Sequence, residues 1–175
     1  MARRAPLLMP DAGPLITLAY AGCLDLLLRP GWPLHLVDMV LHEVTRNQTP
    51  TSQSIQAFVN EHKPPLVTTG TYLHHQALQR GTGGGPAPRK AGLGELALQE
   101  AINQLALAEP AQTVVLLFED HKIASTAFHL PAGTQRVSTR AYLLFLQEKG
   151  WLRSAAEVER QAVIAGRKFS QLRFP

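Results

Sequence analysis

Acidic side chains interrupt or follow apolar segments at several places in this sequence. They are Asp11, Glu43, Glu95 and the adjacent pair Glu119 and Asp120. Asp11 lies in the middle of LLMPDAGPLITLAY, residues 7–20, which is otherwise almost wholly apolar. Burying a lone carboxylate is costly unless a partner neutralises it. The sequence therefore raises the question of what Asp11 pairs with.

A divalent cation would answer that question. Carboxylates that meet at one point repel one another strongly, and a bound cation removes the repulsion. Hard oxygen ligands suit Mg²⁺ or Mn²⁺. One or two such ions can activate a water molecule and hold a phosphodiester for in-line attack. The hypothesis is that Asp11 shares a metal ion with Glu43, Glu95 and Asp120.

Each acidic position also has a plainer interpretation. Asp11 could cap the helix that follows it, and Glu119 with Asp120 could cap another. Glu95 could be an ordinary acidic residue in the first turn of its helix. Glu43 could lie on a solvated helix face. The positions carry more weight together, because all of them fit the carboxyl end of a parallel sheet, where open α/β sheets bind their ligands.

The elements that would position these residues alternate along the chain. Strands are predicted over residues 5–10, 34–37, 64–69, 113–118 and 135–139. Helices are predicted over residues 14–20, 24–28, 38–46, 55–59, 71–80, 94–108, 121–130, 140–152 and 154–166. Short apolar strands that alternate with helices are typical of an α/β fold with a parallel sheet.

Helix ends are predicted from capping residues. N-caps are expected at Asp38, at Ser52 or Ser54, and at Ser154. Ser154 has Glu157 three residues on, which is the spacing of a capping box. Gly150 and Gly166 suit the position just after a helix, where a left-handed backbone is common.

Composition limits the class of protein. The chain has 175 residues, 45% of them hydrophobic, and is expected to form one domain over residues 1–175. Its net charge of +4 is compatible with a polyanionic partner. The lone Cys23 excludes an internal disulfide framework and a cysteine-based zinc site. No segment approaches the roughly 18 apolar residues of a membrane span, so a cytoplasmic location is expected.

The order of these motifs resembles that of the PIN-domain family, especially its branch of VapC-like toxins and predicted nucleases. That branch reads D-S-S-P-L-I-x-L-A-x-x-G-x-L-D-L-L, and here residues 11–27 read DAGPLITLAYAGCLDLL. The family elements V-x-x-E-V and L-G-E-A-E-A-I-x-L-A correspond to LHLVDMVLHEVTR and LGELALQEAINQLA. The strand ending in D-D-x-x-A-R-x-x-A corresponds to LLFEDHKIASTA, and the tail from GWLRS onward is similar to the family's ending.

The resemblance implies a three-layer α/β/α sandwich with a central, mainly parallel sheet. It implies a Mg²⁺- or Mn²⁺-dependent endoribonuclease that cleaves single-stranded RNA, with Asp11, Glu43, Glu95 and Asp120 as catalytic metal ligands. Glu119 matches the first aspartate of the family's pair and would share or replace the role of Asp120. Many such proteins are toxins paired with a small antitoxin protein, often as homodimers.

Several positions depart from the family pattern. Ala12 and Gly13 replace two serines, Glu119 replaces an aspartate, Ser125 replaces an arginine, and STRA at 138–141 keeps only Thr139 of a G-T-x-G turn. These departures support a second hypothesis, a degenerate PIN module that binds RNA or a protein partner without cleaving. A third, an aspartyl-phosphate phosphotransferase, needs an acid two residues after Asp11, where Gly13 stands.

Basic residues supply candidate contacts to RNA. Arg89 and Lys90 follow the glycine-rich segment and could bind phosphates beside the metal, or lie on a solvated loop. Thr139 is a third candidate for substrate binding, carried over from the family's turn. The C-terminal third is also rich in positive charge, through Arg136, Arg140, Arg153, Arg167, Lys168 and Arg173. That surface could face RNA or an antitoxin, or serve solubility alone.

Overall fold

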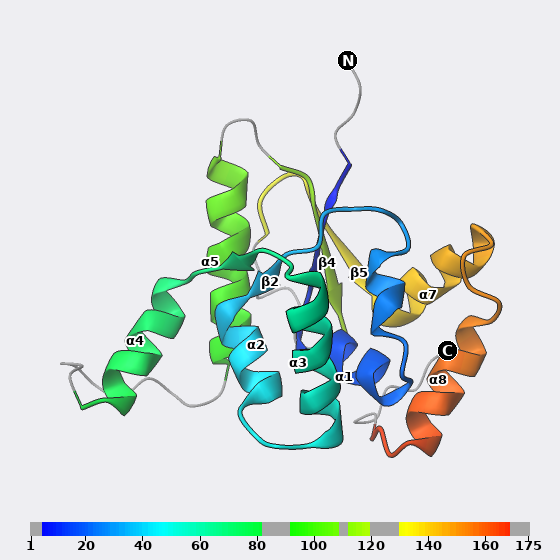
Figure 1. Ribbon diagram of the computed structural model, residues 1–175. Helices are drawn as coiled ribbons and strands as arrows, with labels where there is room; N and C mark the ends of the chain where they lie inside the picture. The colour runs from blue at the N-terminus through cyan, green and yellow to red at the C-terminus, as the bar shows by residue number, and fades with distance from the viewer. Residues whose placement is uncertain (1–4, 82–91, 109–111, 120–129, 169–175) are drawn as a thin grey trace.

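The computed structural model describes residues 5–81, 92–108, 112–119 and 130–168. Figure 1 shows a parallel sheet at the centre of the molecule with helices around it. The main sheet has the order β1–β4–β5 and consists of β1 (Leu7–Pro10), β4 (Val114–Phe118) and β5 (Thr134–Ser138). β2 (Leu36–Val37) and β3 (Leu66–Val67) form a second parallel pair. An isolated bridge from Leu8 to Leu34 links the two sheets.

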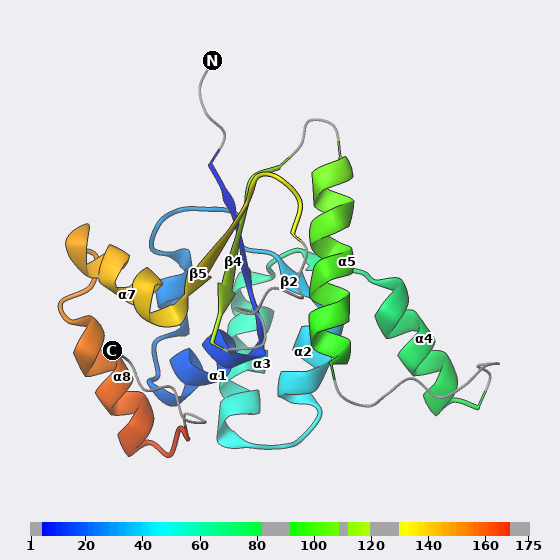
Figure 2. The ribbon, with the colours of Figure 1, turned by 180° about the vertical axis from the view of Figure 1, so that it is seen from behind.

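Helices lie on both sides of this sheet. They are α1 (Ala12–Tyr20), the 3-10 helix η1 (Leu24–Leu28), α2 (Asp38–Thr45), α3 (Pro50–His62), α4 (Gly70–Gln79), α5 (Leu93–Leu107), α7 (Thr139–Glu148) and α8 (Ala155–Ile164). α3 stands in front of the sheet in Figure 1, whereas α5 comes to the front in the reversed view of Figure 2. The predicted α/β class with a parallel sheet is confirmed.

The central strands form because their side chains are apolar on both faces. Leu8 and Met9 in β1, and Leu116 and Leu117 in β4, have no solvent exposure. Continuous apolar runs of this kind are typical of parallel strands that are covered by helices on both sides. The helices add their own apolar faces, and Tyr142 of α7 donates its hydroxyl proton to the carbonyl of Leu26 at 2.8 Å. One core therefore joins both halves of the chain.

Two predicted helix starts are wrong. Val37 is the N-cap of α2, and Asp38 is the first helical residue. The buried Asp38 carboxylate instead accepts hydrogen bonds from the backbone N–H and the hydroxyl of Thr69, both at 2.7 Å. α3 is capped by Thr49, which forms a reciprocal capping box with Ser52. Thr49 takes this position because the next residue is a proline, which suits the first turn of a helix.

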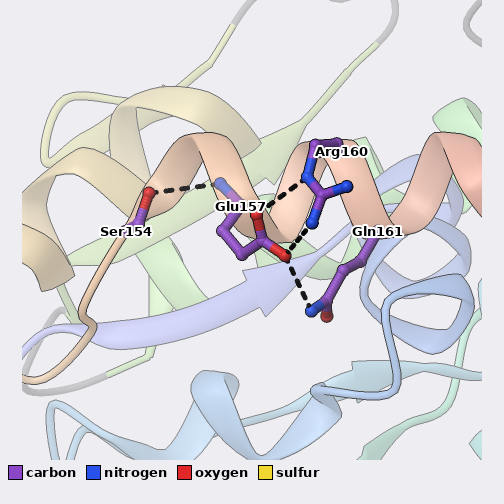
Figure 3. Close-up of polar contacts among 4 residues, drawn as sticks. All are labelled: Ser154, Glu157, Arg160 and Gln161. Atoms are coloured by element: carbon purple, nitrogen blue, oxygen red, sulfur yellow. Dashed lines mark hydrogen bonds and ion pairs between the residues drawn. The ribbon is translucent and has the colours of Figure 1, made fainter.

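The predicted end signals of the last two helices are largely confirmed. Gly150 and Gly166 follow α7 and α8 with φ angles of +74° and +110°. The Ser154 hydroxyl accepts a hydrogen bond from the backbone N–H of Glu157, but the Glu157 carboxylate turns to Arg160, so the capping box is half formed (Figure 3). The predicted helix at 121–130 falls on residues 120–129, which lie outside the described residues, as do 82–91 of the glycine-rich segment.

α4 is attached differently from the other helices. It contributes no buried residue and projects from the body beside α5 in Figure 1. Its first turn is held by Glu100 of α5, which accepts hydrogen bonds from the backbone N–H groups of Gly70 (2.6 Å) and Thr71 (3.1 Å). No helix in the described part of the chain is long and apolar enough to cross a membrane.

Candidate functional site

The described candidate acidic residues follow or adjoin elements that meet near one end of the sheet. The carboxyl ends of β1, β4 and β5 lie together at the lower end of the sheet in Figure 1, and α5 also begins there. Asp11 directly follows β1, and its backbone N–H donates to the carbonyl of Leu117 in β4 at 2.9 Å. Glu119 directly follows β4, and Thr139 directly follows β5. The backbone therefore places these residues at the edge that the sequence predicts.

Asp11 does not act as a side-chain cap for α1. It occupies the N-cap position with an extended backbone (φ −76°, ψ 176°), but its carboxylate makes no capping hydrogen bond within the described residues. The reason lies partly in Pro14, which occupies the N3 position and has no N–H to donate. The capping interpretation therefore holds for the position of this residue but not for its carboxylate.

Glu43 meets the beginning of α5. Its Oε1 accepts a hydrogen bond from the backbone N–H of Gly94 at 3.2 Å. A Cβ atom at position 94 would lie 2.5 Å from Glu43 Oε2, so the close approach depends on glycine. The Glu43 side chain is half-buried in this arrangement, and the interpretation of a freely solvated helix face is therefore wrong.

The electrostatic setting of Glu43 disfavours its charged form. Burial raises the pKa of the Glu43 carboxyl, and the neighbouring Glu95 raises it further. The Gly94 N–H, Arg46 and His75 act in the opposite direction, but the pKa remains above its ordinary value. Glu43 and Glu95 are thus close enough to repel each other. A bound cation would remove this repulsion, as the hypothesis of a metal site requires.

Glu119 has a different partner. Its Oε2 accepts a hydrogen bond from the Thr17 hydroxyl at 2.9 Å and another from an Arg167 Nη at 2.9 Å. Arg167 also donates from Nε to the Thr17 hydroxyl oxygen at 2.9 Å. The Glu119 and Arg167 side chains are only 9% and 19% exposed. The structure therefore neutralises this carboxylate with a cation from the protein itself.

Thr139 is buried, and its hydroxyl oxygen has no hydrogen-bond partner among the described residues. The same holds for Oε1 of Glu119. These two residues directly follow the paired strand ends Phe118 and Ser138. Polar atoms that are buried without a partner are rare in folded proteins. Two buried oxygen atoms, one at the end of β4 and one at the end of β5, therefore have no hydrogen-bond partner among the described residues.

The described residues do not by themselves form a metal site. Among them, no group of three or more His, Cys, Asp or Glu side chains could hold a metal ion. Glu43 and Glu95 are neighbouring oxygen donors whose mutual repulsion fits two ligands of a hard divalent cation. Asp120, Arg89 and Lys90 lie outside the described residues.

Arg167 is the residue near this site that sequence reasoning missed. It follows the helix stop at Gly166 and is one of several basic residues in the C-terminal third. Its partner Glu119 lies 48 positions earlier in the chain. No periodicity or motif in the sequence connects the two. The one signal in the sequence is the acidic pair after an apolar strand, because a buried acid there needs a neutralising cation nearby.

Comparisons with known proteins bear on the fold. No protein-family model and no curated protein matches the chain. Among solved structures, it is similar to the PIN domain of RRP44 from T. brucei, with a TM-score of 0.50 and 16% sequence identity. The likeness covers 83% of this chain and 83% of that one. The chain therefore has a PIN-like α/β/α fold, as its sequence predicts.

Proposed function

We propose that this protein is a metal-dependent endoribonuclease that cleaves single-stranded RNA by in-line attack of water. The observation that carries the proposal is the half-buried Glu43, which accepts a hydrogen bond from the Gly94 N–H at the start of α5 and has Glu95 as a neighbour, near the end of the sheet where Asp11 stands. A PIN-like fold supports it, because a nuclease is the activity that the resemblance to PIN domains implies. The repulsion between two neighbouring carboxylates also favours the binding of a cation.

The proposed metal ligands are Asp11, Glu43, Glu95 and Asp120. When bound, Mg²⁺ or Mn²⁺ activates the attacking water and neutralises charge on the phosphate. Other groups of the chain hold the proposed ligands in position. The Gly94 N–H orients the Glu43 carboxylate, and the backbone hydrogen bond from Asp11 to Leu117 ties the start of α1 to β4.

The proposed substrate contacts come from Arg89, Lys90 and Thr139. Lysine and arginine bind phosphates largely through charge, so their contribution to RNA affinity falls as salt rises. The Thr139 hydroxyl is a neutral hydrogen-bonding group beside the ends of the strands. The sequence resemblance to VapC-like toxins further supports a toxin paired with a small antitoxin protein, acting as a homodimer in the cytoplasm.

A second candidate function is a degenerate PIN module that binds RNA or a protein partner without cleaving. The Glu119–Arg167 pair favours it, because one acidic position at the sheet edge is already neutralised by the protein. The replacements at Ala12 and Gly13 favour it as well.

RNA cleavage separates the two candidates. Wild-type protein, Asp11→Asn and the control Asp25→Asn should be assayed on single-stranded and duplex RNA with Mn²⁺ and with EDTA. Asp25 is a suitable control because its side chain is 55% exposed and pairs only with Arg29 among the described residues. We expect Asp11→Asn to lose at least about 100-fold in rate, since it removes a charged ligand, and Asp25→Asn to retain activity.

Two outcomes would contradict the proposed nuclease activity. Equal cleavage by wild-type protein and Asp11→Asn would indicate a contaminating enzyme. Binding of single-stranded RNA that needs no metal, with no cleavage at any Mn²⁺ concentration, would favour the degenerate module.

A further inference from the structure

We propose that Arg167 is a positioning residue that serves as the permanent cation of the acidic position at the end of β4. Glu119 then anchors the C-terminal turn to α1 and is not a metal ligand. The inference deepens the proposed function, because it rests on the metal site proposed above and narrows the residues that form it.

The contacts form a closed triangle. Thr17 and Arg167 both donate to Glu119 Oε2, and Arg167 Nε donates to the Thr17 hydroxyl, with all three distances at 2.9 Å. The three residues come from the end of β4, from α1 and from the turn after α8. Charge-assisted hydrogen bonds of this kind are about twice as strong as neutral ones. A metal ion at Oε2 would have to displace both donors.

Burial makes that displacement costly. The Glu119 side chain is 9% exposed and the Arg167 side chain 19%. A guanidinium that lost this carboxylate would remain largely buried without its opposite charge, and breaking such a pair from one side is strongly unfavourable. Oε1 of Glu119 is buried and has no hydrogen-bond partner among the described residues, so within that part of the chain the carboxylate is held through Oε2 alone.

Gly13 is part of the same arrangement. A Cβ atom at position 13 would lie 2.9 Å from the Cβ of Glu119 and 3.3 Å from its Oε2. The Glu119 side chain therefore lies over the first turn of α1, in space that any side chain at position 13 would occupy. Two departures from the PIN pattern, glycine for serine at 13 and glutamate for aspartate at 119, therefore lie against each other.

The contacts among Thr17, Glu119 and Arg167 also affect the position of Asp11. Asp11 is the N-cap of α1, two residues before Gly13, and Thr17 lies on the same helix. Glu119 contacts both ends of this short segment, and Arg167 holds Glu119. Arg167 thereby fixes the orientation of the start of α1 against β4, and with it the place of the proposed ligand Asp11.

Binding of Mn²⁺ without RNA tests whether Glu119 is a ligand. Titration calorimetry should compare wild-type protein, Glu119→Gln and Glu95→Gln. Glutamine keeps an acceptor for Thr17 and Arg167 but removes the negative charge. We expect Glu119→Gln to leave the Kd for Mn²⁺ within about threefold of wild type, whereas Glu95→Gln weakens binding at least about tenfold. Equal weakening by both variants would overturn the proposal.

A double-mutant cycle in EDTA tests the anchor without any metal. The cycle uses Glu119→Gln, Arg167→Gln and the double variant, with Arg167→Lys in place of Arg167→Gln should the latter not fold. The exposed pair Glu157 and Arg160 on α8 provides the control cycle (Figure 3). We expect a coupling of at least about tenfold in the unfolding equilibrium constant for the first pair and below about threefold for the second. Similar couplings in both cycles would overturn the proposal.

The two proposals fail in different ways. If the wild-type protein binds no Mn²⁺ at about millimolar concentration, the proposal of a metal-dependent nuclease is refuted. The cycles in EDTA would still decide the role of Arg167, because they contain neither metal nor RNA.

Discussion

Two acidic positions near the same end of the sheet differ in whether the protein pairs them directly with a cation. Burial is the main cause of the raised pKa of Glu43; Glu95 raises it further, whereas Arg46 and His75 lower it. Among the described residues, Glu43 has no salt bridge. Glu119 forms a salt bridge with the Arg167 guanidinium and accepts a hydrogen bond from the Thr17 hydroxyl. The Glu43 carboxylate is therefore the one that a metal ion could bind without displacing a bound cation of the protein.

A third acidic residue shows that short distances alone do not measure stability. Glu157 and Arg160 on α8 approach at 2.6 and 2.8 Å, closer than Glu119 and Arg167 at 2.9 Å. Their side chains are 43% and 63% exposed and lie within one helix turn (Figure 3). Solvent screens such a pair, whereas the less exposed pair joins segments that are far apart in the sequence.

The largest effect is expected at Arg167. Replacing it by methionine keeps much of its apolar stem but leaves the Glu119 carboxylate buried without a cation. We expect a loss of about 3 kcal/mol in the free energy of unfolding, measured by urea denaturation. Arg160→Met, the matched control, should leave the urea midpoint unchanged within error, since its pair is exposed. Equal losses in the two variants would remove the distinction between the pairs.

An intermediate effect is expected at Gly13. In Gly13→Ala the new methyl group would meet the Cβ of Glu119, which is fixed by the backbone, at 2.9 Å. Overpacking of this kind typically costs about 1–3 kcal/mol. Gly94→Ala should cost less, because its methyl group meets the movable end of Glu43. Thermal unfolding of both variants checks the order, and a greater loss for Gly94→Ala would contradict it.

The smallest effect is a pH dependence at Glu43. Its raised pKa means that the folded protein keeps this proton to a higher pH than the unfolded chain does. The stability from this group is therefore present at acid pH and lost as pH rises through the window above the ordinary value of 4.5. Glu43→Gln should gain stability over wild type across that window, by less than about 1 kcal/mol because the side chain is only half-buried. Urea midpoints in EDTA from pH 4 to 8 measure it, and a gain that shrinks with rising pH would contradict this account.

Much of the fold follows from local pattern. The strands β1 and β4 can be recognised from the sequence because both of their faces are buried and their residues are therefore continuously apolar. The order of strands and helices then indicates a parallel sheet. The positions of Asp11 and Glu119 at the sheet edge follow from the same pattern. Capping at Thr49 was missed because several hydroxyl residues stand together there, and local sequence does not rank them.

The rest depends on contacts between distant residues. The bond of Asp38 to Thr69 replaces a predicted cap, and it spans 31 positions. Glu119 meets Gly13 on one side and Arg167 on the other, and neither contact follows any repeat in the sequence. Every acid at the sheet edge is therefore a candidate ligand by sequence alone, because the sequence does not show which acid is paired with a cation of the protein.

The way α4 is attached also bears on how the molecule fluctuates. Because this helix has no fully buried residue, and its first turn is held by Glu100, by the buried cap Thr69 and by Tyr72, its later turns can open without disturbing the strands of the core. Segments with little buried surface exchange their amide hydrogens through local opening, well below the cost of global unfolding. Deuterium should therefore enter residues 74–79 long before it enters β4, which makes α4 a natural place for a spectroscopic label that reports motion while the core stays intact.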